Sequence, residues 1–73
     1  MYSVNDLIRI ASLGGGLELN AKNYTTNDLI RIASLASGKG ARITISVLEK
    51  KLSVDDMIRI ASLGKGCVSF KGL

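Results

Sequence analysis

Three arginines occupy equivalent places in a pentapeptide, Arg-Ile-Ala-Ser-Leu, that occurs three times and begins at Arg9, Arg31 and Arg59. If the copies lie side by side, these guanidinium groups, with Lys39 and Lys65 nearby in sequence, would form a basic surface for phosphates or an acidic partner. An aspartate precedes each arginine by three residues, at Asp6, Asp28 and Asp56. That spacing pairs charges along a helix. We favour local pairing, because charged helix faces are usually only solvated.

Residue types that support catalysis are scarce in this chain. Histidine is absent, and Cys67 is the one cysteine. A reactive thiol needs a partner that stabilises its thiolate, so we expect Cys67 to be a small buried residue instead. The carboxylates outside the helix starts, Glu18 and Glu49, form no set of nucleophile, base and orienting group. We therefore predict no catalytic, cofactor or metal site and expect that the protein is not an enzyme.

The tripeptide Gly-Lys-Gly occurs at residues 38–40 and 64–66 and superficially resembles part of a phosphate-binding loop. Such a loop precedes a helix, so that backbone N–H groups and the helix dipole face the phosphate, and its lysine is followed by Ser or Thr. Here each tripeptide follows an expected helix, and glycine follows the lysine. We interpret both segments as turns between a helix and a strand.

Composition leaves binding functions open without favouring nucleic acid. The net charge of +4 is common among soluble domains. Aromatic platforms for single strands are lacking, since the aromatic residues are Tyr2, Tyr24 and Phe70. No apolar run approaches the roughly 20 residues of a membrane span, and the first residues do not resemble a signal peptide. We expect a cytoplasmic protein with no membrane association, for which nucleic acid is a disfavoured partner.

Each pentapeptide lies within a segment that carries helix-start signals. The N-cap position holds Ser3, Thr25 or Ser53. With the aspartate three residues later, each forms a capping box with Asp in the acidic place. Apolar residues before and after the cap predict hydrophobic staples: Tyr2 with Leu7, Tyr24 with Leu29, and Leu52 with Met57. These signals predict three helices.

The expected helices end at glycine, and each has a wide apolar face. Gly14, Gly38 and Gly64 are placed for left-handed C-caps. An alanine lies near the centre of each apolar face, at Ala11, Ala33 and Ala61. A small side chain there allows a neighbouring element to approach closely.

A short alternating segment follows each helix, at residues 17–20, 43–46 and 68–71. Period-two alternation predicts strands with one buried face, and the helices that separate them make the strands parallel. The second strand is open to extension through Val47 and Leu48. Polar residues alternate onto the opposite, solvent-exposed face: Glu18, Asn20, Thr44, Ser46, Ser69 and Lys71. Because one face of the sheet is solvent-exposed, we expect all helices to pack on the other face.

The sequence thus predicts one α/β domain, residues 1–73, with helix–strand repeats at about 2–23, 24–51 and 52–73. We expect a short solenoid with a parallel three-stranded sheet and all helices on one face. Its organisation resembles that of leucine-rich repeats, which also have a strand and a helix in about 20–29 residues. The strand signature of that family is missing, so no functional residues follow from the resemblance. Helices need more room than strands, so the strand side should be concave and suited to binding.

Such a small domain is marginally stable alone, and no terminal segment caps its repeats. We expect a homodimer in which the third strand pairs antiparallel with its symmetry mate, through an edge made of Cys67, Val68, Ser69 and Phe70. Contact through the helix sides or the concave face stays open. The predicted function is protein interaction and self-association, with an unidentified protein as a further partner. Weak anion or nucleic-acid binding through the basic row is the alternative.

Overall fold

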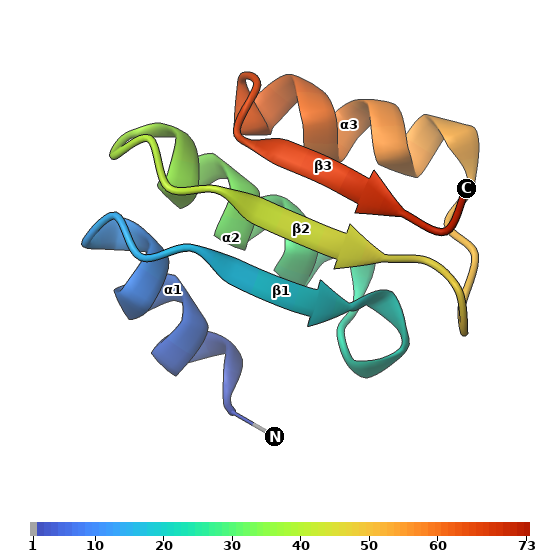
Figure 1. The fold of residues 1–73 in the computed structure, drawn as a ribbon, viewed down its shortest axis with the longest axis horizontal. Coiled ribbons are helices and arrows are strands. Elements are labelled where there is room, and N and C mark those ends of the chain that lie inside the picture. Colours follow the sequence, from blue (N-terminus) through green and yellow to red (C-terminus); the bar gives the residue numbers. More distant parts are fainter. Residues whose placement is uncertain (1) are drawn as a thin grey trace.

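In the computed structural model, which describes residues 2–73, three helices and a three-stranded sheet alternate along the chain. Met1 belongs to the predicted domain but lies outside the described residues. Figure 1 shows the sheet in front and the helices behind it, which confirms the α/β class. In chain order the elements are α1 (Val4–Ser12), β1 (Leu17–Asn20), the 3-10 helix η1 (Ala21–Asn23), α2 (Thr26–Ser37), β2 (Ile43–Ser46), α3 (Val54–Gly64) and β3 (Val68–Lys71).

All three helices begin where the caps predict. The hydroxyl oxygens of Ser3, Thr25 and Ser53 accept hydrogen bonds from the backbone N–H groups three residues later, over 3.1–3.2 Å. Each bond satisfies one amide that the first helical turn leaves without a partner. The staple predicted at the first helix is not built like the others, because Tyr2 is largely exposed whereas Tyr24 and Leu52 pack against the core.

The helix ends differ from the predicted glycine C-caps. Gly14 does adopt a left-handed conformation, but Gly38 is right-handed. Gly64 is the last residue of α3, and Lys65 takes the left-handed position after it, with φ 48°. Packing explains the shift at α3, because a Cβ on Gly64 would collide with the side chain of Val68. Glycine is needed there for close approach of the helix to β3, and the turn is displaced onto the lysine.

The strands pair in the predicted register. The sheet is parallel with the order β1-β2-β3. The paired positions on its inner face form two rows, one of Leu17, Ile43 and Val68 and one of Leu19, Ile45 and Phe70. The second strand ends at Ser46 and does not extend to Leu48, although the Val47 N–H still donates to the Lys71 carbonyl over 2.9 Å. The outer face carries the polar residues that alternate with these rows.

The core lies between the sheet and the helices, and α2 contributes more buried residues to it than either of the other helices. Leu29, Ile32, Ile43, Ile45 and Ile60 are its largest fully buried side chains. Neighbouring helices approach closely at the predicted alanines in two cases: Ala11 and Ala33 are fully buried. Ala61 is exposed, contrary to that expectation, because within residues 2–73 no element packs on the outer side of α3.

Candidate interaction surfaces

The outer face of the sheet is polar and presents the side chains that the alternation placed there. Thr44 and Ser69 lie in register on β2 and β3, and their hydroxyl oxygens are 3.1 Å apart in a hydrogen bond. Glu18 occupies the same row on β1 and is exposed. The next row holds Asn20, Ser46 and Lys71. These residues form one continuous surface, as predicted from the sequence, with hydroxyl, amide and charged groups.

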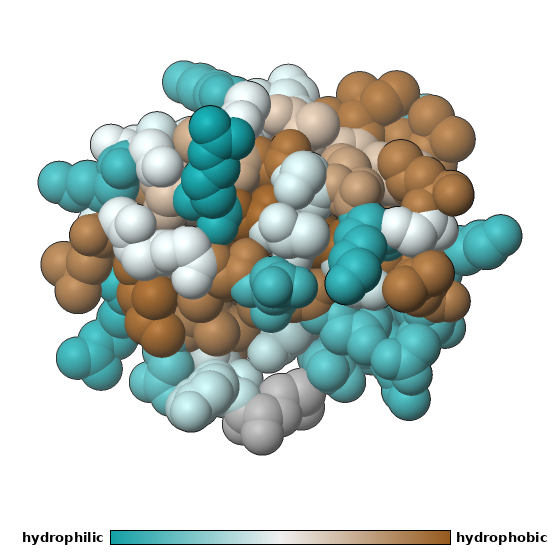
Figure 2. All heavy atoms as spheres, in the orientation of Figure 1, coloured by the Kyte–Doolittle hydropathy of each residue, from teal (hydrophilic) through white to brown (hydrophobic). Residues whose placement is uncertain are grey.

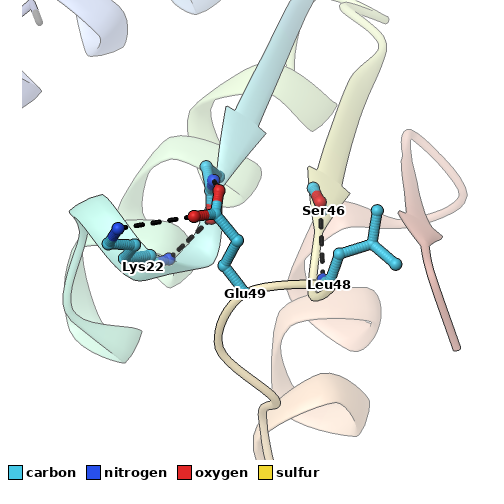
Figure 3. A network of polar contacts seen from close by, with 5 residues as sticks. Lys22, Ser46, Leu48 and Glu49 are labelled. Carbon is cyan, nitrogen blue, oxygen red and sulfur yellow. Dashed lines mark hydrogen bonds and ion pairs between the residues drawn. The ribbon is translucent and has the colours of Figure 1, made fainter.

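Asn20, Lys22 and Glu49 form a polar cluster at the end of β1 (Figure 3). The Asn20 side-chain oxygen accepts from the Lys22 N–H over 3.0 Å, which caps η1. Its amide nitrogen donates to Glu49 Oε2, and the Lys22 ammonium lies 3.4 Å from Glu49 Oε1. The Asn20 hydrogen bond, followed by the hydrogen bond and positive charge of Lys22, lowers the pKa of Glu49. The cluster ties the loop after β2 to the loop after β1.

This cluster predicts an acid-sensitive contribution to stability. The pKa of Glu49 lies below its ordinary value of 4.5 in the folded chain, so the carboxylate contributes stability above that pH. The contribution is lost as the pH falls through the folded pKa. In Glu49→Gln, unfolding midpoints in urea should therefore decrease less between pH 6 and pH 3 than in the wild type. Asn20→Ala should reproduce part of this change. Equal acid dependence of Glu49→Gln and wild type would contradict it.

The predicted basic residues are distributed over the three helices and the turns that follow two of them. Arg31 and Arg59 each pair with the aspartate of their own helix, at 4.0 Å from Asp28 and 3.8 Å from Asp56. Within residues 2–73 Arg9 and Asp6 do not form such a pair, although their spacing is the same. The arginines are exposed on α1, α2 and α3. Lys39 and Lys65 instead lie in the turns that follow α2 and α3. Local pairing thus offsets part of the positive charge.

The predicted dimer edge is formed by β3, at one side of the sheet. Val68 and Phe70 are half-buried on its inner face, and Ser69 is exposed. Cys67 lies one residue before the strand and is also half-buried, so the expectation of a buried thiol is only partly met. Its N–H donates to the Gly64 carbonyl and its carbonyl accepts from the Ile43 N–H. The backbone of Cys67 therefore stabilises the turn after α3 and the start of the pairing between β2 and β3.

Large apolar side chains are exposed at the two ends of the helix layer, and on the middle helix α2 Leu35 is partly exposed as well. On α1 and its flanks they are Tyr2, Ile10 and Leu13, which line a shallow hollow with Asp6 and Arg9. On α3 they include Val54 and Ile58. Figure 2 shows hydrophobic atoms gathered over α3 at the upper right and, at the lower left, over the turn before β1.

The described residues supply little for small-molecule chemistry. Among residues 2–73 no group of three His, Cys, Asp or Glu side chains is placed to hold a metal ion. A small hollow between the end of the chain and the start of α3 is mainly apolar, with the lining residues Val47, Lys51, Leu52, Met57, Gly72 and Leu73. Across the same residues, no helix has the length and apolar character needed to cross a membrane.

Compared with known proteins, the chain matches no family model, no curated protein and no solved structure. Its surfaces are therefore interpreted from their own geometry.

Proposed function

We propose that this chain is a cytoplasmic, non-catalytic interaction module, a short solenoid of three helix–strand repeats that associates with itself. The observation that carries the proposal is the exposure of large aliphatic side chains at both ends of the helix layer. Val54 is 66% exposed and Leu13 is 86% exposed. Single exposed apolar residues are ordinary, but grouped ones typically mark contact surfaces.

The size of the chain supports association. A domain of 73 residues buries only about 60–65% of the surface that its unfolded chain exposes, so additional apolar burial adds substantially to its stability. Common remedies for small domains are disulfides, metals and oligomerisation. One cysteine cannot form an internal disulfide, and the described residues hold no metal-binding cluster. Of these three sources of stability, oligomerisation is the one that the exposed apolar side chains support.

Anion binding by the arginines receives less support. Both Arg31 and Arg59 pair with acidic side chains on their own helices, and these aspartates also lie beside the helix N-termini. A phosphate would compete with these carboxylates for the guanidinium groups. If anion binding were nevertheless the function, affinity for duplex or single-stranded nucleic acid would fall steeply with salt.

Sedimentation equilibrium over a range of protein concentrations tests the proposal. The expected result is a weight-average mass that rises above the 7.7 kDa of a single chain as concentration increases. Hydrophobic burial drives the expected association, so moderate salt should not abolish it. A mass of 7.7 kDa at every concentration, up to roughly millimolar, would overturn self-association.

A further inference from the structure

We propose that self-association is head to tail, with the α3–β3 end of one copy covering the α1–β1 end of the next. This inference rests on the proposed self-association and specifies its partner surfaces. We define the tail face as the outer side of α3, represented by Val54 and Ala61. Ile58 lies at its border, where it also lines a shallow hollow with Asn27 and Ile30 of α2. The head face is the outer side of α1, represented by Tyr2, Ile10 and Leu13.

The tail face is exposed because, within residues 2–73, no helix packs on the outer side of α3. Ala11 and Ala33 are fully buried on α1 and α2, whereas the equivalent Ala61 is exposed. Ile58 is 60% exposed, although the equivalent residues Ile8 and Ile30 pack against the core cluster. The same side-chain types are therefore covered twice within the chain and left uncovered once. Another helix against α3 would complete the pattern.

The head face shows the converse pattern. Ile32 and Ile60 are fully buried, and the equivalent Ile10 is 41% exposed. Leu13 is also more exposed than Leu35 and Leu63, its counterparts on the other helices. The hollow beside Ile10 and Leu13 is open. A preceding helix would cover this face, as α1 covers α2 and α2 covers α3.

The two faces carry the residue types found at equivalent positions on α1 and α2, two helices that pack against each other. The residues Val54, Ile58 and Ala61 of the tail face and its border correspond to Val4, Ile8 and Ala11 on α1. Ala11 is fully buried, and Val4 and Ile8 pack against the core. The residues Tyr2, Ile10 and Leu13 of the head face correspond to Tyr24, Ile32 and Leu35. Tyr24 packs against the core and Ile32 is fully buried, whereas Leu35 is 42% exposed. A junction between copies would therefore reproduce an existing contact with identical residue types.

One polar contact extends the match. The Tyr24 hydroxyl donates to the backbone carbonyl of Tyr2, its counterpart in the preceding repeat, over 3.5 Å. In a head-to-tail junction the hydroxyl of Tyr2 would reach the carbonyl of Leu52 in the preceding copy by the same geometry. The Tyr2 side chain is largely exposed, so its hydroxyl is available at the head face.

The sheet supports the same arrangement. Because the strand order is β1-β2-β3, β1 and β3 are its opposite edges and carry unpaired backbone groups. Continuing the parallel register would place Leu17 beside Val68 and Leu19 beside Phe70 in the neighbouring copy, extending both inner rows. A two-fold dimer through β3 would pair only that edge and leave the head face bare. A heterologous contact uses both faces and produces a ring or a filament.

The test blocks each face in a separate variant. Ile10→Lys blocks the head, and Ala61→Lys blocks the tail. Both positions are exposed in the single chain, whereas their equivalents are fully buried. An unpaired ammonium in that contact should weaken association at least about tenfold. Ser34→Lys, on the exposed side of α2 away from either end, is the matched control. Circular dichroism establishes that each variant is folded, and Tyr2→Lys and Val54→Lys replace any that is not.

We expect each blocked variant alone to sediment as a 7.7 kDa monomer and their equimolar mixture to form a species of twice that mass. The mixture recovers one intact head and one intact tail, and it cannot grow further. The Ser34→Lys control should assemble like the wild type. If the head-blocked variant self-associates as strongly as the wild type, or the mixture remains monomeric, head-to-tail assembly is overturned while self-association stands. A wild type that stays monomeric overturns both.

Discussion

Ile32→Ala should destabilise the folded chain by about 2–5 kcal/mol, the usual cost of removing a fully buried aliphatic side chain. Ile32 lies in the core on α2 and has no exposed surface. Since small domains lose about 4–8 °C of Tm for each kcal/mol, the melting temperature should fall by about 10 °C or more. Thermal and urea denaturation measure the effect.

Ile10→Ala is the matched control, since it removes the same atoms from the equivalent position of α1. Ile10 is partly exposed in the single chain, so the lost burial and the cavity are both smaller. Both substitutions should be made in the tail-blocked Ala61→Lys background, in which association does not contribute to stability. Equal destabilisation by the two substitutions would show that Ile10 is as buried as Ile32. That result would contradict the placement of α1 at an exposed end of the helix layer.

Ala33→Leu should destabilise the chain by about 1–3 kcal/mol, because it overfills the contact between α2 and α3. Ala33 is fully buried there, and the ideal Cβ position of Gly64 lies 3.6 Å from the Ala33 Cβ. The space for three more carbon atoms is therefore absent unless the helices separate. Urea denaturation with an unchanged m-value would show that the loss lies in the folded state.

Ala61→Leu is the control for this prediction. Its side chain would project from the exposed tail face, and surface substitutions of this kind change stability by about 0.5 kcal/mol or less. The variant should nevertheless associate less well, because the tail face accommodates only a small side chain at this position. A loss of folding stability equal to that of Ala33→Leu would show that the tail face is not open.

Local features of the fold were predictable from the sequence because they depend on neighbouring residues. The caps at Ser3, Thr25 and Ser53 require only a hydroxyl and an amide three residues later. The register of the sheet followed from the strict alternation of apolar and polar residues. A shift of one residue would have moved Leu19 and its row to the solvent-exposed face. The polar outer face was predicted for the same reason.

Features that depend on tertiary contacts were not predictable in this way. The left-handed residue at the end of α3 is Lys65 and not the predicted Gly64, because Val68 packs directly against Gly64. The polar cluster around Glu49 joins two loops that are 27–29 residues apart in sequence. The exposure of Ala61 could not be predicted from the repeated pentapeptide, because the three copies are identical and differ only in their place in the helix layer. Equivalent residues were therefore expected to have equivalent surroundings.

A disulfide between neighbouring copies tests the head-to-tail arrangement most directly. In the Cys67→Ser background, Glu18→Cys and Ser69→Cys would be made in separate chains, one of them labelled with ¹⁵N. Both residues occupy the row that includes Thr44, on opposite edges of the sheet. Within one chain they are two strand spacings apart, about 9.6 Å, which is too far for a disulfide. Across a head-to-tail junction they would be about 4.8 Å apart, which is within reach.

Mass spectrometry after mild oxidation of the equimolar mixture distinguishes the arrangements. Head-to-tail assembly predicts that the main product is the mixed dimer, joined between position 18 of one copy and position 69 of the other. Chains joined mainly through position 69 to position 69 would show that β3 pairs with its own symmetry mate, and would contradict the account.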